Sequence, residues 1–143
     1  MREDKCLELD KQLCFPLYAA SREVIRKYKP FLDEIGLTYT QYIVMLVLWE
    51  KEKIAMHELG EKLFLDSGTL TPLLIKLEQK ALVERVKNEK DERELIVQIT
   101  EKGIGLKVEA RKIPKAIGRC LNISPMEAVQ LRKILKKILK AQN

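Results

Sequence analysis

The side chain with the most reactive chemistry in this chain is the thiol of Cys14. The sequence has three cysteines, Cys6, Cys14 and Cys120, and no Cys-x-x-Cys pair. Cys14 falls close to the expected start of a helix, where the helix dipole favours an anion, and the thiolate is the nucleophilic form of cysteine. Hydroperoxides oxidise a thiolate to sulfenic acid, which a second thiol can trap. The competing interpretation is packing, because a free cysteine is also a good small hydrophobe.

A second group of residues has the composition of a surface that reads nucleic acid. In residues 65–80 the leucines recur at three- and four-residue spacing, which makes one face of a helix apolar: Leu70, Leu73, Leu74 and Leu77. Short polar residues gather at the start of this helix: Asp66, Ser67, Gly68, Thr69 and Thr71. Asp66 or Ser67 can cap it, and Pro72 is expected near its first turn. A polar helix end without bulk suits contact with base edges in the major groove, and an ordinary capped surface helix is the alternative.

The residues after this helix favour the DNA-reading interpretation. Two β-branched runs, 82–87 and 95–100, flank a charged, turn-prone segment, and this pattern predicts a hairpin. A short helix over 56–64 precedes the reading helix, and Ile54-Ala55 could add a third strand. This order of elements is that of a winged helix-turn-helix. The basic residues expected to contact DNA are Lys76 on the helix and four on the hairpin: Arg85, Lys87, Lys90 and Arg93. The acidic hairpin residues are expected to be solvated, with Asp91 placed to orient Arg93: Glu89, Asp91, Glu92 and Glu94.

Charge and composition set outer bounds on the class of protein. The length of 143 residues fits one domain, and no apolar run reaches membrane-spanning length. The net charge of +6 divides into zero over residues 1–49, −2 over 50–100 and +8 over 101–143, so bulk charge is weak evidence for DNA binding. The charged start has no signal-peptide pattern, which favours a reducing cytoplasm without structural disulfides. No metal-ligand spacing is found, His57 is expected on the surface, and no cofactor is expected.

The remaining helices exceed what a small winged unit needs. Helices are expected over 8–35, over 39–49, over 101–119 and over 124–141. Pro16 places the first start, Pro30 is expected to kink or interrupt the first helix, Pro114 disturbs the third, and Thr38 with Gln41 forms a capping box for the second. The apolar stripes of the outer helices predict a twofold homodimer on a pseudo-palindromic operator. The chain is therefore predicted to be one domain, with dimerisation helices in 1–37 and 101–143 and a DNA-binding unit in 38–100.

Five blocks of the chain together resemble the MarR family of transcriptional regulators, in particular its organic-hydroperoxide-sensing branch. They are residues 12–19 (QLCFPLYA), 28–30 (YKP), 38–42 (TYTQY), 64–74 (FLDSGTLTPLL) and 91–93 (DER). The resemblance covers essentially the whole chain. The wing block is shared across the broad family, whereas the Leu-Cys-Phe block with both tyrosines is typical of the sensing branch.

The resemblance implies a dimeric repressor of a peroxide-detoxifying gene that leaves its operator when an N-terminal cysteine is oxidised. It maps the sensor onto Cys14 and its tyrosine partners onto Tyr28 and Tyr39, within reach of the thiol. It also implies wing contacts at Asp91 and Arg93 and major-groove contacts by Ser67, Gly68, Thr69, Thr71 and Lys76. Relatives often have two basic residues where this chain has Ile75-Lys76, so part of that contact is in doubt. Cys120 is either the resolving partner of Cys14 across the dimer or a space-filling residue, with a small cellular thiol as resolver, and Cys6 is a bystander.

Three classes of function remain open at this stage. The favoured one is a redox-switched repressor, and the second is a MarR-type regulator that responds to a small aromatic or anionic ligand. The third is a thiol peroxidase in which the same cysteine turns over. Helical content and the wing disfavour the enzyme, and the two tyrosines disfavour the ligand sensor.

Overall fold

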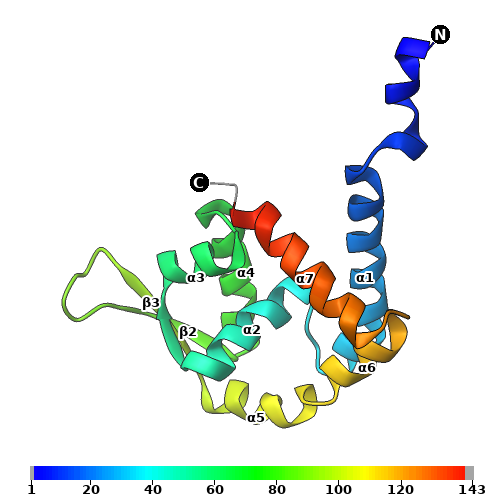
Figure 1. Cartoon of the computed structure of the whole chain (residues 1–143). Coiled ribbons are helices and arrows are strands. Elements are labelled where there is room, and N and C mark those ends of the chain that lie inside the picture. Colours follow the sequence, from blue (N-terminus) through cyan, green and yellow to red (C-terminus); the bar gives the residue numbers. More distant parts are fainter. Residues whose placement is uncertain (1, 141–143) are drawn as a thin grey trace. The chain divides into compact units, whose positions relative to one another are not determined.

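A computed structural model describes residues 2–140 of the chain as two compact units, residues 1–113 and 114–143. The first unit begins with two short 3-10 helices, η1 (Arg2–Leu7) and η2 (Leu9–Lys11). Long helix α1 (Cys14–Glu34) follows, and Figure 1 shows the short helices leading away from its first turn. All residues of the short helices are exposed.

Helix α1 confirms the expected start and corrects the expected end. Pro16 is its third residue, where a missing N–H costs little because the first four amides of a helix have no helical partner. Of the predicted kink or interruption at Pro30, the interruption is wrong, because α1 runs through Pro30 to Glu34. Only one main-chain bond is lost there, and the buried side chain of Leu32 holds the last turn against the core. Gly36, with φ of +69°, then turns the chain out of the helix.

Helix α2 (Tyr39–Lys51) is the centre of the first unit. Its N-terminus has the predicted capping box: the Gln41 amide donates to Thr38 Oγ1 over 3.3 Å, and the Thr38 amide donates to Gln41 Oε1 over 3.1 Å. Buried side chains lie on most of its circumference, and the helix contacts every neighbouring element: α1, α3, α4, α5, β1 and β3. The prediction of a buried central helix is confirmed.

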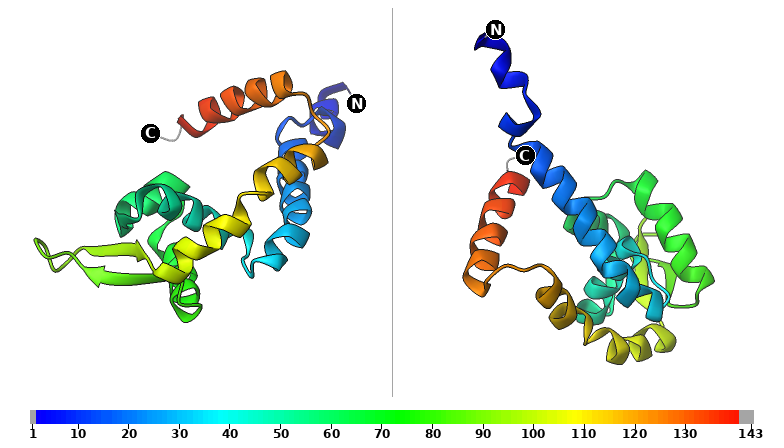
Figure 2. Two further views of the ribbon diagram at one scale, coloured as in Figure 1. Left: turned by 90° about the horizontal axis from the view of Figure 1, so that it is seen from below. Right: turned by 90° about the vertical axis from the view of Figure 1, so that its right-hand side faces the viewer.

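The winged unit is built as predicted. Strand β1 (Lys53–Ala55) leads into α3 (Met56–Leu63), and α4 (Ser67–Gln79) buries the four predicted leucines: Leu70, Leu73, Leu74 and Leu77. Strands β2 (Val83–Lys87) and β3 (Leu95–Ile99) form the hairpin, and β1 adds to β3, which gives an antiparallel sheet of order β1-β3-β2. Figure 1 and the left view of Figure 2 show the hairpin projecting from the helices of this unit.

Pro72 lies later in its helix than expected, and Pro114 divides the helix that it was predicted to disturb. Pro72 is the sixth residue of α4, in its second turn, and not in the first turn as expected. The buried leucines of α4 stabilise the helix despite the lost bond. The predicted helix over 101–119 is divided into α5 (Glu101–Ala110) and α6 (Ile113–Cys120). Pro114 has no N–H to donate to the Ala110 carbonyl, which explains why α5 ends at that residue.

The second unit contains most of α6 and the whole of α7 (Pro125–Lys140). The Ser124 amide donates to Glu127 Oε1 over 2.9 Å and the Glu127 amide donates to Ser124 Oγ over 3.1 Å, so the predicted start is confirmed. The expected end near Ala141 lies outside the described residues. Helix α7 buries none of its residues, and its apolar side chains are exposed: Met126, Val129, Leu131, Ile134, Ile138 and Leu139.

No helix in residues 2–140 is long and apolar enough to cross a bilayer by itself. Helices α1 and α2 meet the length and composition criteria only as a pair, which is bent by 68° at their junction, and α2 forms the buried core described above.

Candidate functional site

The N-terminus of α4 presents small polar residues around a capped first turn. Asp66 is the N-cap, and its Oδ1 accepts the Thr69 amide over 2.7 Å. Ser67, Gly68 and Thr69 are all exposed, and a side chain at Gly68 would add bulk to this end of the helix. The free amides and positive dipole end of such a turn suit an anion or a base edge.

The rest of α4 extends this surface along one side. Thr69 and Lys76 are seven residues apart, so they share a face of the helix, and both are exposed. Thr71 is half-buried, and Ile75 exposes an apolar side chain next to Lys76. Thr69 and Lys76 therefore share an exposed flank of α4, beside the face that carries the four buried leucines.

The Asp66 cap makes a pH-dependent contribution to stability. The Thr69 amide, donating to the carboxylate, holds the pKa of Asp66 below its ordinary value of 3.8. A lowered folded-state pKa stabilises the native state above that ordinary value, and the contribution disappears as the pH falls through the folded pKa. We expect an Asp66→Asn protein, which keeps a capping oxygen, to lose less stability than the unsubstituted protein between pH 5 and pH 2. Urea unfolding followed by circular dichroism measures this difference, and identical pH profiles would contradict it.

The base of the wing is held by a polar network. Asn88 Nδ2 donates to Glu94 Oε2 over 2.8 Å, and Glu94 Oε1 lies 3.0 Å from His57 Nδ1 on α3. The expectation that Glu94 is simply solvated is therefore wrong, because its carboxylate joins the two ends of the loop to α3. His57 is exposed as predicted.

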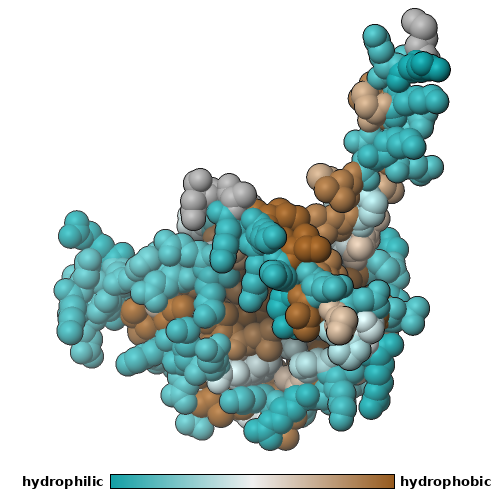
Figure 3. Space-filling view, viewed as in Figure 1, coloured by the Kyte–Doolittle hydropathy of each residue, from teal (hydrophilic) through white to brown (hydrophobic). Residues whose placement is uncertain are grey.

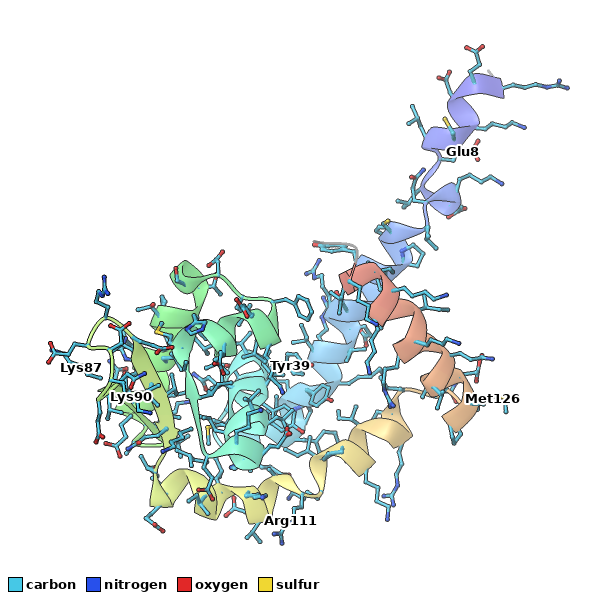
Figure 4. All side chains as sticks on the ribbon, turned by 60° about the vertical axis from the view of Figure 1, so that its left-hand side comes forward. Glu8, Tyr39, Lys87, Lys90, Arg111 and Met126 are labelled. Atoms are coloured by element: carbon cyan, nitrogen blue, oxygen red, sulfur yellow. The ribbon has the colours of Figure 1, made fainter. Side chains whose placement is uncertain are left out.

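The tip of the wing carries the predicted basic residues. Figure 3 shows hydrophilic side chains covering the tip, and Figure 4 shows Lys87 and Lys90 on the wing. Asp91 Oδ1 accepts the Arg93 amide over 3.1 Å and lies 3.5 Å from the guanidinium Nε. The Arg93 side chain is 94% exposed, so it is oriented by Asp91 but free to reach a phosphate or a groove.

Arg85 differs from the other wing residues. Its guanidinium forms an ion pair with Glu78 of α4, and both side chains are half-buried. Arg85 thus joins β2 to α4 and sets their spacing, a role that the sequence did not reveal. The exposed basic residues on the hairpin are then Lys87, Lys90 and Arg93.

Cys14 is the first residue of α1 and is exposed, so its thiol is accessible in the single chain. Its neighbours on the helix are apolar and also exposed: Leu13, Phe15, Leu17 and Tyr18. In the single chain the Cys14 thiol therefore fills no core position, and packing against a second copy is the alternative to a reactive thiol.

Tyr28 of α1 and Tyr39 of α2 contact each other, with ring centroids 4.9 Å apart. Figure 4 labels Tyr39 at the start of α2. Tyr42 is a third member, 5.7 Å from Tyr28, which the sequence analysis missed although its spacing of three from Tyr39 on α2 predicts a shared face. Burial, together with the smaller effects of the neighbouring Tyr39 and Tyr42, raises the pKa of Tyr28 to about 12. These phenols are therefore protonated at neutral pH and can donate hydrogen bonds.

The structure does not bring Cys14 and the tyrosines together in one chain. Cys14 and Tyr28 are separated by fourteen residues of continuous helix, which at 1.5 Å per residue is about 21 Å. The expectation that the phenols are within reach of the Cys14 thiol is wrong for a single subunit, because both groups belong to the same rigid helix. Any contact between them requires a second copy.

The other two cysteines differ in their surroundings. Cys120 is the last residue of α6, in the second unit, and is half-buried. Cys6 lies in η1 and is exposed, with its Sγ 3.1 Å from the Glu3 carbonyl oxygen. Within residues 2–140, no group of three or more His, Cys, Asp or Glu side chains could hold a metal ion.

Comparison with known proteins identifies the family. A family model described as "Transcriptional regulator SarA/Rot" matches residues 26–110, which is more than half of the chain and contains the whole winged unit. The organic hydroperoxide resistance transcriptional regulator of Bacillus subtilis is 44% identical over 90% of this chain and 85% of its own. The chain belongs to the MarR/SarA family of transcriptional regulators. Members of this family are regulators and not enzymes, which removes the thiol peroxidase interpretation.

Two further relatives of this MarR/SarA-family chain come from staphylococci. The HTH-type transcriptional regulator SarZ of Staphylococcus aureus is 49% identical over 84% of this chain and 81% of its own. The structure of overoxidised AbfR bound to DNA superimposes with a TM-score of 0.78 at 34% identity, over the whole of both chains. AbfR, which is a protein of Staphylococcus epidermidis, has also been solved in a reduced form on DNA and in a disulfide form. The winged helix-turn-helix fold is thus confirmed by a relative solved on DNA.

Proposed function

We propose that this protein is a dimeric transcriptional repressor of the bacterial cytoplasm that senses organic hydroperoxides through Cys14. The observation that carries the proposal is the exposed Cys14 thiol at the N-terminus of α1, in a chain whose other half is a winged DNA-binding unit. Identity of 44% to an organic hydroperoxide resistance regulator supports the same conclusion. The oxidant acts as the signal, and the double-stranded operator is the partner.

A homodimer accounts for the apolar surface of the outer helices. Leu13 is 85% exposed, and apolar side chains on α7 are exposed along its whole length. A twofold axis that pairs two such surfaces buries both at once, as residues 1–37 and 101–143 were expected to do. The two α4 helices then meet successive major grooves of a pseudo-palindromic site.

The same axis completes the sensor. When two α1 helices pair in antiparallel directions, the first turn of one helix lies beside the later turns of the other. Cys14 then approaches Tyr28 of the partner subunit and Tyr39 of the partner subunit. Their protonated phenols donate hydrogen bonds to the thiolate, which stabilises its charge. Within one chain, α1 keeps Cys14 and Tyr28 about 21 Å apart. The dimer thereby supplies a contact that a single chain cannot make.

Oxidation proceeds by nucleophilic attack of the thiolate sulfur on the terminal oxygen of the hydroperoxide. The S–O bond forms as the O–O bond breaks, and the alkoxide leaves and takes up a proton as the alcohol. The sulfur becomes sulfenic acid, which no longer accepts the phenol hydrogen bonds as an anion. A second thiol condenses with it, forms a disulfide and releases water.

A small displacement is sufficient for release. The dimer must fit two grooves at once, so a small rotation of one subunit breaks one half-site. A tenfold loss of affinity corresponds to only ~1.4 kcal/mol.

The proposal is tested by adding cumene hydroperoxide to the reduced protein on a fluorescent operator and following polarisation. One equivalent per subunit should release the DNA, and further hydroperoxide should not be consumed. Operator binding that persists after mass spectrometry shows complete oxidation of Cys14 would overturn the proposal. Release by a small aromatic anion without any oxidation would indicate the ligand-responsive class instead.

The resolving thiol is identified by a non-reducing gel of the oxidised protein. A covalent dimer, lost in a Cys120→Ser variant, assigns resolution to Cys120 of the partner subunit. A monomer that carries a small-thiol mass adduct on Cys14 assigns resolution to a cellular thiol.

The wing supplies affinity through Arg93. An Arg93→Ala variant should bind the operator about tenfold more weakly, because it removes one charged contact to DNA. Its thermal stability should not change, since the side chain is 94% exposed and its ion pair with Asp91 lies on the surface. Polarisation titrations at several salt concentrations measure both the affinity and the salt slope, and an unchanged slope would contradict a contact to phosphate.

A further inference from the structure

The last turn of α4 is joined to the α1–α2 junction by the side chain of Lys80. Lys80 follows α4 directly and is its C-cap. Its ammonium group donates to the Gly36 carbonyl over 2.5 Å and to Gln41 Oε1 over 2.8 Å. These acceptors are 44 and 39 residues away in sequence. The contact therefore fixes the end of the DNA-reading helix relative to the start of α2.

The side-chain oxygen of Gln41 accepts hydrogen bonds from two different parts of the chain. Its Oε1 accepts the Lys80 ammonium and also the Thr38 amide of the α2 capping box, over 3.1 Å. The residue is only 3% exposed, so these bonds are largely shielded from water and a lost partner is not replaced readily. The cap of α2 and the end of α4 cannot move apart without breaking one of these bonds.

The tyrosine pair lies at the same end of α2. Tyr39 is the first residue of α2, directly after the Thr38 cap, and its ring contacts Tyr28 of α1. Gly36, the other acceptor of Lys80, lies in the short turn between α1 and α2 with φ of +69°. A displacement of Tyr39 relative to Tyr28 therefore shifts both of the groups that hold Lys80.

Other contacts hold the end of α4 to a different element. Lys102 Nζ donates to the Lys80 carbonyl over 2.9 Å, and Thr100 Oγ1 donates to the Ala81 carbonyl over 2.6 Å. Both donors lie at the start of α5. These two hydrogen bonds therefore do not connect α4 with the tyrosine pair. Lys102 thus provides a matched lysine that holds the end of α4 to α5 and not to the start of α2 beside the tyrosine pair.

We propose that Lys80 is a positioning residue that transmits a displacement of the Tyr28–Tyr39 pair to α4, through its hydrogen bonds to Gly36 and Gln41. The inference rests on the proposed function, because it is the oxidation of Cys14 that moves the pair. Lys80 does not touch DNA in this role. It determines whether α4 follows α2 when the sensor changes state.

The test compares operator affinity before and after oxidation in four proteins: unsubstituted, Lys80→Met, Lys102→Met and Gln41→Glu. Lys80→Met keeps the aliphatic stem and removes the ammonium, and its reduced form should bind the operator within about threefold of the unsubstituted protein. Its oxidation-induced loss of affinity should be at least about tenfold smaller, a difference of ~1.4 kcal/mol. Lys102→Met and Gln41→Glu, which retains an acceptor for Lys80, should keep the full loss.

A second readout separates this coupling from a merely structural role. Trp49 is the single tryptophan, lies on α2, and donates from Nε1 to the Gly103 carbonyl over 2.8 Å. The centroid of its ring lies 6.3 Å from the centroid of the Tyr42 ring. Oxidation should change Trp49 emission equally in the unsubstituted and Lys80→Met proteins, because α2 still moves while α4 no longer follows.

The outcomes distinguish the two proposals. An unsubstituted protein that does not respond to oxidation overturns the proposed function. If the unsubstituted protein loses affinity on oxidation as expected and Lys80→Met loses as much, the coupling by Lys80 is overturned. Equal losses in Lys80→Met and Lys102→Met also overturn it, because they indicate general weakening of the α4 end. If Lys80→Met is poorly folded by circular dichroism, Lys80→Leu, which also lacks a donor, replaces it with the same expected results.

Discussion

A Cys14→Ser protein should bind operator DNA with the affinity of the reduced protein and remain bound when organic hydroperoxide is added. A serine hydroxyl is not oxidised by hydroperoxide, so the sulfenic acid cannot form and the tyrosine contacts are not changed. The unsubstituted protein should lose at least about tenfold in affinity under the same conditions, or ~1.4 kcal/mol. Fluorescence polarisation on a labelled operator, with the oxidation state checked by mass spectrometry, measures both.

Cys6→Ser is the matched control for this experiment. Cys6 is also exposed and near the N-terminus, but it lies in η1 outside α1. It should respond to hydroperoxide as the unsubstituted protein does. A Cys14→Ser protein that is still released, or a Cys6→Ser protein that is not, would assign the sensor to another thiol.

A Gly103→Ala protein should be severely destabilised, although alanine favours a helix. A Cβ atom at Gly103 would lie 2.5 Å from the Leu82 carbonyl oxygen and 2.7 Å from Ile99 Cγ1. The Leu82 carbonyl is part of the backbone between the end of α4 and the start of β2, against which α5 packs. A backbone atom in this position cannot move aside at low cost. Overpacking of this kind costs about 3 kcal/mol. The corresponding fall in the midpoint of thermal unfolding is roughly 10 °C for a chain of this size.

Gly105 provides the control on the same helix. A Cβ at Gly105 would meet nothing within 4 Å, and the residue is exposed. Gly105→Ala should therefore stabilise the protein by up to about 1 kcal/mol through helix propensity alone. Differential scanning calorimetry of the two variants measures the contrast, and two melting points that shift in the same direction would show that the close approach at Gly103 is not the cause.

Much of the fold follows from patterns that are local in the sequence. The leucine stripe of α4, the capping boxes at Thr38 and Ser124 and the charged hairpin tip each depend on residues within one or two turns of each other. The helix division before Pro114 was missed because the sequence predicts a disturbance but not which main-chain bond is given up. The run through Pro30 was missed because the tertiary contacts of the final turn outweigh one lost bond.

The site divides in the same way. The reactive and DNA-reading groups can be identified from residue types and spacing: a thiol at a helix start, a small polar first turn on α4, and basic residues on a hairpin. How these groups lie relative to one another depends on the packing of the helices. It separates Cys14 from Tyr28 along one helix, pairs Arg85 with Glu78, and brings Lys80 to Gly36 across 44 residues of chain. Such contacts depend on how α1, α2 and α4 pack, and packing is set by the buried faces of all three helices together and not by the spacing within any one.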